Sequence, residues 1–76
     1  MSQQRASFAL KSGRAFLEKG NLSDAVVQLT TAISADAASA EPHSLLAEAY
    51  ERQGKLAEAA VERKKAAAIS GGQTQR

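Results

Sequence analysis

The sequence predicts an all-α protein of four antiparallel helices, arranged as two helix–turn–helix units. Alanine, the residue that favours the helix most, dominates the composition. Helix breakers are rare, because the 76-residue chain has one proline and five glycines. The chain also matches itself when it is shifted so that Gly20 falls on Gly54. Together these observations indicate long helices with few interruptions and an internal repeat.

The internal repeat rests on more than the high alanine content. A glycine, a leucine, a valine and an aromatic residue recur in one register, and chance pairing of alanines does not produce that. The matched pairs are Ala6/Ala40, Ala15/Ala49, Phe16/Tyr50, Gly20/Gly54, Leu22/Leu56, Asp24/Glu58, Ala25/Ala59, Val27/Val61 and Ala32/Ala66. We expect five of these pairs to pack the two copies together: Phe16/Tyr50, Leu22/Leu56, Ala25/Ala59, Val27/Val61 and Ala32/Ala66.

The helix boundaries follow from glycines and capping residues. Gly20 and Gly54 each end one helical run and precede another, which is typical of a helix C-terminus. Asn21 or Ser23 is expected to cap the second helix, and Ser39 the third, with Pro42 in its first turn. The expected helices are 4–19, 23–36, 40–53 and 57–70. The chain then divides into a flexible tail 1–5, a first repeat 6–39, a second repeat 40–70 and a flexible tail 71–76.

Composition argues against several classes of function. The formal net charge is only +2, with the signs mixed along the chain, whereas nucleic acid binding needs a concentrated basic face. The one basic run, Arg63-Lys64-Lys65, fans around its helix and is expected to be solvated, with contact to nucleic acid or anionic lipid as the alternative. No apolar stretch approaches the roughly 18 residues of a membrane span or resembles a signal peptide. We therefore expect a cytoplasmic protein that binds neither nucleic acid nor membranes.

The sequence also argues against catalysis and cofactors. There is no cysteine, and the only histidine, His43, is expected to pack in the core rather than bind a metal. No Ser/His/Asp arrangement, phosphate-binding glycine loop or metal-ligand spacing occurs. We expect the protein not to be an enzyme, and to use no cofactor and no metal.

The repeat resembles the tetratricopeptide repeat (TPR) family, whose unit is a 34-residue helix–turn–helix. The first copy carries the family's pattern as Ala15-Phe16, Gly20, Ala25 and Ala32, and the second copy carries its counterparts. The resemblance implies a short right-handed α-solenoid, with Gly13 and Ala47 as the small residues at the close contact of each hairpin. The copies depart from the pattern at Ala9 and His43, where a large residue is usual, at Arg63, where the first copy has Leu29, and at Ala37 and Gly71, where a proline is common.

In the TPR family the first helix of each unit lines a concave groove, and the resemblance implies the same here. Leu10, Arg14 and Leu17 also share one helix face, because they are spaced i, i+4 and i+7. The groove would be lined by Ser7, Leu10, Arg14, Leu17, Glu18, Glu41, Ser44, Glu48, Glu51 and Arg52. The alternative for the charged residues is that Glu48/Arg52 and Glu51/Lys55 are ordinary surface pairs.

Two functions remain open at this point. In the first, the groove binds a peptide or helix of a partner protein that has apolar anchors and a basic residue. In the second, the chain associates with itself as a homo-oligomer or forms part of a longer TPR scaffold. Self-association is favoured because about three repeats are usually needed for stability, and because a domain of this length buries a small share of its surface.

Overall fold

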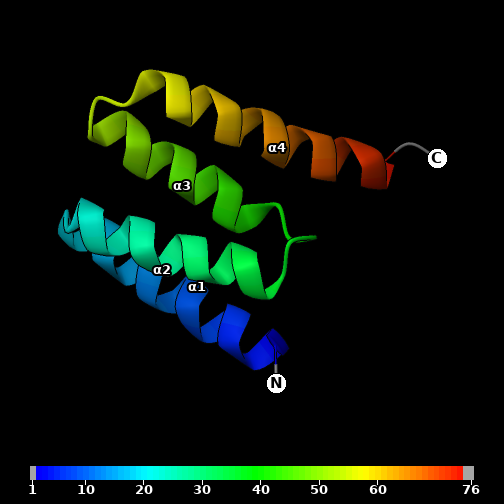
Figure 1. Ribbon diagram of the computed structural model, residues 1–76, viewed down its shortest axis with the longest axis horizontal. Coiled ribbons are helices and arrows are strands. Elements are labelled where there is room, and N and C mark those ends of the chain that lie inside the picture. Colours follow the sequence, from blue (N-terminus) through cyan, green and yellow to red (C-terminus); the bar gives the residue numbers. More distant parts are fainter. Residues whose placement is uncertain (1, 75–76) are drawn as a thin grey trace.

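The residues that the structure describes, 2–74, form four helices joined by short turns. In this computed structural model the helices are α1 (Ser2–Lys19), α2 (Leu22–Ala35), α3 (Glu41–Arg52) and α4 (Leu56–Thr74). No strand occurs among the described residues. The helices lie beside one another in chain order and make a flat body of 38 × 32 × 16 Å (Figure 1). The prediction of an all-α helical-repeat fold is confirmed.

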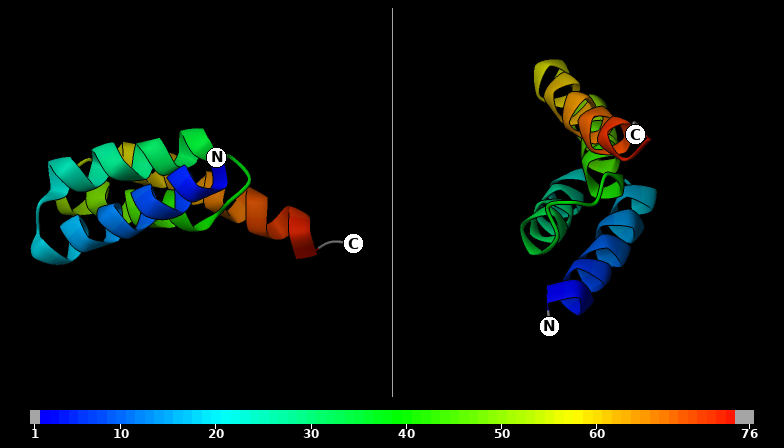
Figure 2. Two further views of the ribbon diagram at one scale, coloured as in Figure 1. Left: turned by 90° about the horizontal axis from the view of Figure 1, so that it is seen from below. Right: turned by 90° about the vertical axis from the view of Figure 1, so that its right-hand side faces the viewer.

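The four helices form two antiparallel hairpins, one stacked on the other. α1 packs on α2, and α4 packs on α3. The second hairpin contacts the first mainly through α3 and α2, while α1 touches α3 at few points. The right-hand view in Figure 2 shows the same layering, with α1 and α4 at opposite ends of the stack. Each end therefore presents helix surface that no other part of the described chain covers.

The two hairpin turns are geometrically equivalent, which supports the internal repeat. Gly20 and Gly54 both have φ +82°, a left-handed conformation that glycine adopts without steric cost. The Asn21 N–H donates to the Phe16 carbonyl at 2.9 Å, and the Lys55 N–H donates to the Tyr50 carbonyl at 2.8 Å. Donor and acceptor are the same number of residues apart in both hydrogen bonds. The two bonds also occupy equivalent positions when the repeats are aligned with Gly20 on Gly54. The predicted turns are confirmed at both glycines.

The helix ends differ in detail from the predictions. Asn21 and Ala40 are the N-cap residues of α2 and α3, and neither makes a side-chain cap hydrogen bond, so Ser39 is not the cap. Pro42 lies in the first turn of α3 as predicted. α1 and α4 also extend into the expected tails, because residues 2–5 and 71–74 are helical. The remaining tail residues, 1 and 75–76, lie outside the described part.

The core is a cluster of leucine and alanine side chains between the hairpins. Its buried members are Leu17, Ala25, Leu29, Leu46 and Ala49. Partly buried apolar side chains pack around it, namely Leu10, Phe16, Leu22, Val26, Ile33, Leu45 and Tyr50. The aligned alanines that were expected to pack are also buried: Ala25, Ala32, Ala59 and Ala66. Small side chains thus allow the helices to approach closely.

Part of the predicted packing is wrong. Val27 is 58% exposed, Val61 50% and Leu56 67%. Val27 lies two positions from both Ala25 and Leu29, which are fully buried, so it points to the opposite side of α2. A match between two copies thus shows that two positions are equivalent, and equivalent positions can both face solvent.

Candidate partner-binding surface

The ten residues predicted to line the groove lie on the two helices that begin each hairpin, five on α1 and five on α3. All five on α3 are exposed: Glu41, Ser44, Glu48, Glu51 and Arg52. On α1 the exposed members are Ser7, Arg14 and Glu18, whereas Leu10 is half-buried. The fifth member, Leu17, is 4% exposed. The surface is therefore more polar than the sequence predicted.

Leu17 is a correction, because it belongs to the core and does not line a groove. Its side chain packs in the cluster with Leu29 and Leu46, under the second hairpin. Its carbonyl, in the last turn of α1, accepts a hydrogen bond of 3.1 Å from Arg52 Nη1. The same carbonyl also accepts from the Gly20 N–H at 3.0 Å, so the Arg52 bond is a second one, and it ties α3 to α1. The i, i+7 spacing placed Leu10 and Leu17 on one face correctly, but the neighbouring helix covers the second leucine.

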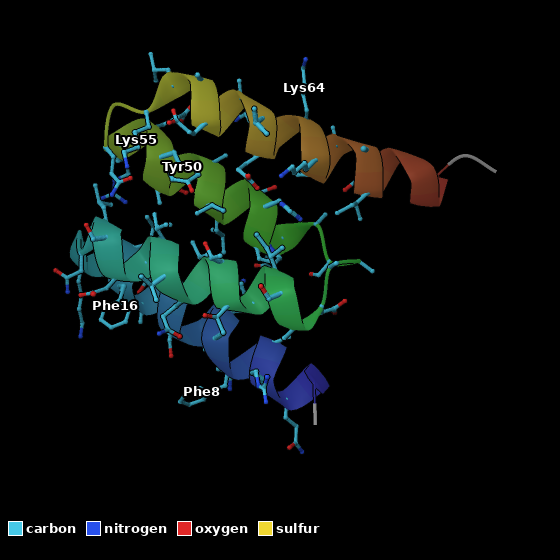
Figure 3. All side chains as sticks on the ribbon, viewed as in Figure 1. Phe8, Phe16, Tyr50, Lys55 and Lys64 are labelled. Atoms are coloured by element: carbon cyan, nitrogen blue, oxygen red, sulfur yellow. The ribbon has the colours of Figure 1, made fainter. Side chains whose placement is uncertain are left out.

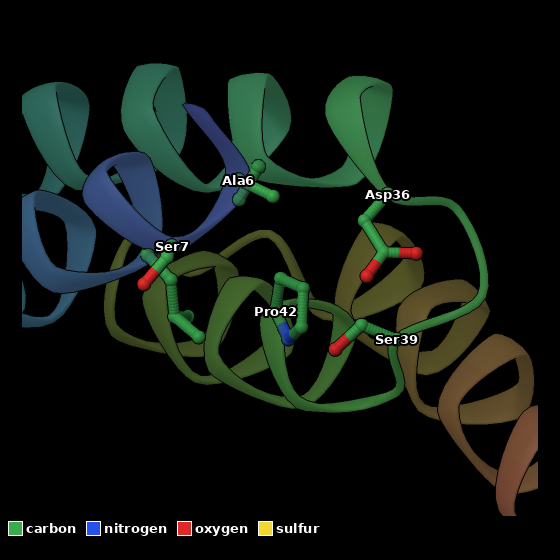
Figure 4. Close-up of a pocket in the computed structure, with 7 residues that line it drawn as sticks. Ala6, Ser7, Asp36, Ser39 and Pro42 are labelled. Carbon is green, nitrogen blue, oxygen red and sulfur yellow. The ribbon is translucent and has the colours of Figure 1, made fainter. Parts of the chain in front are cut away.

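Leu10 and Ser7 line a pocket of about 280 Å³ at the junction of α1, α2 and α3 (Figure 4). Its apolar lining consists of Ala6, Leu10, Ala32 and Pro42. Its polar lining consists of Ser7, Asp36 and Ser39, the last two in or beside the loop between the hairpins. We call this the junction pocket. It combines an apolar wall with one carboxylate and two hydroxyl groups.

A second, larger pocket of about 640 Å³ lies between α3 and α4. It takes three of the predicted residues from α3, Ser44, Glu48 and Glu51. The α4 side is lined by Arg63, Ala66, Ala67 and Ser70, none of which was predicted. We call this the end groove, since it opens on the uncovered side of the second hairpin. Five of the ten predicted residues are thus divided between these two pockets and the other five line neither, so the ten do not line one continuous groove.

Ion pairs occupy much of the charged surface. Arg14 of α1 pairs with Glu41 of α3 across the two hairpins. Arg52 lies 3.6 Å from Glu48, so the local pair expected there is confirmed.

The other expected local pair is wrong, because Glu51 accepts a 2.6 Å hydrogen bond from Arg63 of α4. The Lys55 ammonium instead lies 6.0 Å from the centre of the Tyr50 ring (Figure 3). The charges at these positions are therefore largely matched within the chain.

Comparison with known proteins identifies the repeat. A family model described as the TPR repeat matches residues 13–54, which is more than half of the chain. The chain belongs to the TPR repeat family. TPR repeats are in general non-catalytic, and the chain shares the family's general role as a protein–protein interaction module. No curated protein and no solved structure matches the chain at a significant level.

Two further findings concern the described residues of this TPR protein. None of the helices formed by residues 2–74 is long and apolar enough to cross a lipid bilayer. No group of three or more His, Cys, Asp and Glu side chains in residues 2–74 could hold a metal ion.

The second TPR repeat contains a buried polar contact that the sequence did not reveal. His43 is 6% exposed, as expected for a packing residue, and its Nδ1 lies 2.7 Å from Glu62 Oε1 of α4. Only 12% of the Glu62 side chain is exposed, and Lys65 lies 3.6 Å from its other oxygen. His43 and Glu62 lie on different helices, so no spacing within one helix could predict their contact from the sequence.

Replacing Glu62 with alanine should therefore weaken the second repeat. The buried imidazole would lose its partner, which costs about 1–3 kcal/mol of unfolding free energy. Urea unfolding followed by circular dichroism measures this loss. Glu58→Ala, at an exposed position one turn earlier on α4, is the matched control and should change stability little. Equal losses in both variants would show that the His43 contact contributes nothing.

Proposed function

We propose that the protein is an interaction module that binds a short peptide or helix of a partner protein along α1 and α3. The observation that carries this proposal is the junction pocket. It lies beside two predicted residues, Ser7 and Leu10, and takes lining from α1, α2 and α3. Membership of the TPR family supports protein binding in general, and the pocket supports this particular location.

The lining of the junction pocket suggests the chemistry of the anchor residue. A volume of about 280 Å³ suits one side chain rather than a whole peptide. Leu10, Ala32 and Pro42 offer apolar contact, and the Asp36 carboxylate lies at the rim. One Asp36 oxygen accepts from the Ala38 N–H at 3.2 Å, which holds the side chain in place. A lysine or arginine fits this site best, because its aliphatic part can be buried while its charge reaches the carboxylate.

The rest of the peptide would lie along the exposed residues of α3. Glu48 is half exposed, and its contact with Arg52 is long, at 3.6 Å, so its carboxylate can also meet a basic group of the ligand. Glu41 is already paired with Arg14, so it offers less to a ligand. A peptide with a basic anchor and a second basic residue that reaches Glu48 therefore complements the surface.

Selection of peptides from a random displayed library, followed by calorimetric titration, tests the proposal. The enriched peptides should share a lysine or arginine together with a second basic residue. Ser7→Arg, at an exposed position on the pocket rim, should weaken their binding about tenfold or more, since the new guanidinium would compete for Asp36. The α-helical circular dichroism should not change.

The matched control is Val27→Arg, which places the same side chain at an exposed position of α2 outside the pocket lining. Its affinity for the selected peptides should equal that of the unmodified protein. Failure to enrich any peptide, or equal weakening by both substitutions, would reject the junction pocket as the binding site.

A further inference from the structure

The contact between the two hairpins provides a template for a contact between two copies of the chain. In the template, α3 rests on the first hairpin, and Pro42 is fully buried there. Pro42 faces Leu10, Ala32 and Asp36 in the junction pocket. Since one fixed shift along the sequence relates the two repeats throughout, each member of this contact has a counterpart in the other repeat.

The counterpart of Pro42 is Phe8, on α1. It is 73% exposed, the largest exposed fraction among the exposed large apolar residues. In Figure 3 its side chain points away from the other helices, at the open end of the stack. An aromatic side chain in this position buries substantial apolar area once it is covered, and covering it is therefore favourable.

The counterparts of Leu10, Ala32 and Asp36 are Ser44, Ala66 and Ser70, and all three line the end groove. Serine is smaller than leucine or aspartate, so the end groove has more room at this point. Its volume of about 640 Å³ compares with about 280 Å³ for the junction pocket. The larger side chain, Phe8, thus corresponds to the larger cavity.

The charges of the two surfaces contribute little to this contact. α1 carries four basic residues and one acid. By the template, α1 of the next copy rests mainly on α4, which carries three basic residues and two acids, and touches the acidic α3 at few points. The contact therefore depends on the burial of Phe8 and not on opposite charge.

We propose that copies of this chain stack head to tail, with the Phe8 face of α1 in the end groove of the next copy. This goes beyond peptide binding and uses a different pocket. The contact is heterologous, because two different surfaces meet: the Phe8 face of α1, which we call the head, and the end groove, which we call the tail. Each added copy therefore leaves one head and one tail of the array free to bind again. The product is an open array that continues the order of helices within one chain.

The association is reversible and weak. Three leucines that are buried in the contact between the hairpins have polar counterparts in the contact between copies. The counterpart of Leu17 is Glu51, that of Leu29 is Arg63, and that of Leu46 is Ser12. The contact between copies is therefore more polar than the one within the chain. Analytical ultracentrifugation between about 10 µM and about 1 mM covers the range in which such contacts form. The average mass should rise with concentration beyond that of a dimer.

Two substitutions block one surface each. Phe8→Glu blocks the head, and Ala67→Arg blocks the tail, since Ala67 lines the end groove and is exposed. Each variant alone should remain a monomer. An equal mixture should form a dimer and nothing larger, because one variant keeps a free tail and the other a free head. Both variants should retain the melting temperature of the unmodified protein, as neither position is buried.

Val27→Glu, at another exposed apolar position, is the control and should not change the association. The proposal is overturned if the unmodified protein stays monomeric throughout, if the mixture gives no dimer, or if the control abolishes association as well. A dimer that forms through two Phe8 faces would also overturn it, since mixing would not restore that contact. Peptide binding, measured on the Phe8→Glu monomer because its end groove is unchanged, separates this result from the fate of the junction pocket.

Discussion

Replacing Leu29 with alanine should lower the free energy of unfolding by about 2–5 kcal/mol, the range for a fully buried leucine. Leu29 is 0% exposed and lies in the cluster that joins the two hairpins. A protein of this length has a total stability of only about 4–11 kcal/mol. The substitution therefore removes a large share of it, and a clearly lower urea midpoint is the expected result. Urea unfolding followed by far-ultraviolet circular dichroism measures the change.

Val27→Ala is the matched control, because it shortens an apolar side chain two positions away on the same helix. Val27 is 58% exposed, so its loss should change stability by less than about 0.5 kcal/mol. The outcome that contradicts the described core is a similar loss in both variants, which would mean that α2 is rotated about its axis.

The second large effect concerns Gly13, where α1 and α2 approach most closely. A Cβ atom added at Gly13 would lie 2.7 Å from both Cγ and Cδ2 of Leu29. Leu29 is fully buried and would have to shift within the core, so Gly13→Ala should destabilise the protein by about 1–3 kcal/mol. This outweighs the gain of about 1 kcal/mol in helix propensity. Thermal unfolding followed by circular dichroism provides the measurement.

Gly71→Ala is the control for the propensity term, since no atom lies within 4 Å of a Cβ added there. It should leave stability unchanged or raise it slightly. A double-mutant cycle gives the decisive comparison, because Gly13→Ala should cost much less when Leu29 is already alanine. If the cost of Gly13→Ala is the same in both backgrounds, the close contact is not with Leu29.

Much of the fold was predictable from local chemistry and from the repeat. The turns at Gly20 and Gly54 follow from the conformational freedom of glycine, and the hairpins follow from the short loops. The small residue at Gly13 came from the resemblance to the TPR family, and the contact with Leu29 agrees with it. These features depend on residues close in sequence or on equivalent positions.

The candidate surface was less predictable, because burial depends on how the hairpins stack. Periodicity placed Leu17 on the same side as Leu10, but only the position of α3 decides that Leu17 is covered. The contact of His43 with Glu62 depends on how α3 and α4 cross, which no sequence spacing expresses. The predicted groove residues also divide between two pockets for this reason, since each pocket requires a second helix that the register of α1 and α3 does not specify.

The flat, layered body has a consequence for how the molecule opens. α2 and α3 have neighbours on both sides, whereas α1 packs mainly on α2, α4 packs on α3, and each of the two outer helices faces solvent on its other side. Local opening needs less free energy where fewer contacts must be broken, so the outer helices should fluctuate open before the inner ones. Amide protons of α2 and α3 would then exchange with solvent most slowly, and the protein would lose its structure from the two faces inward.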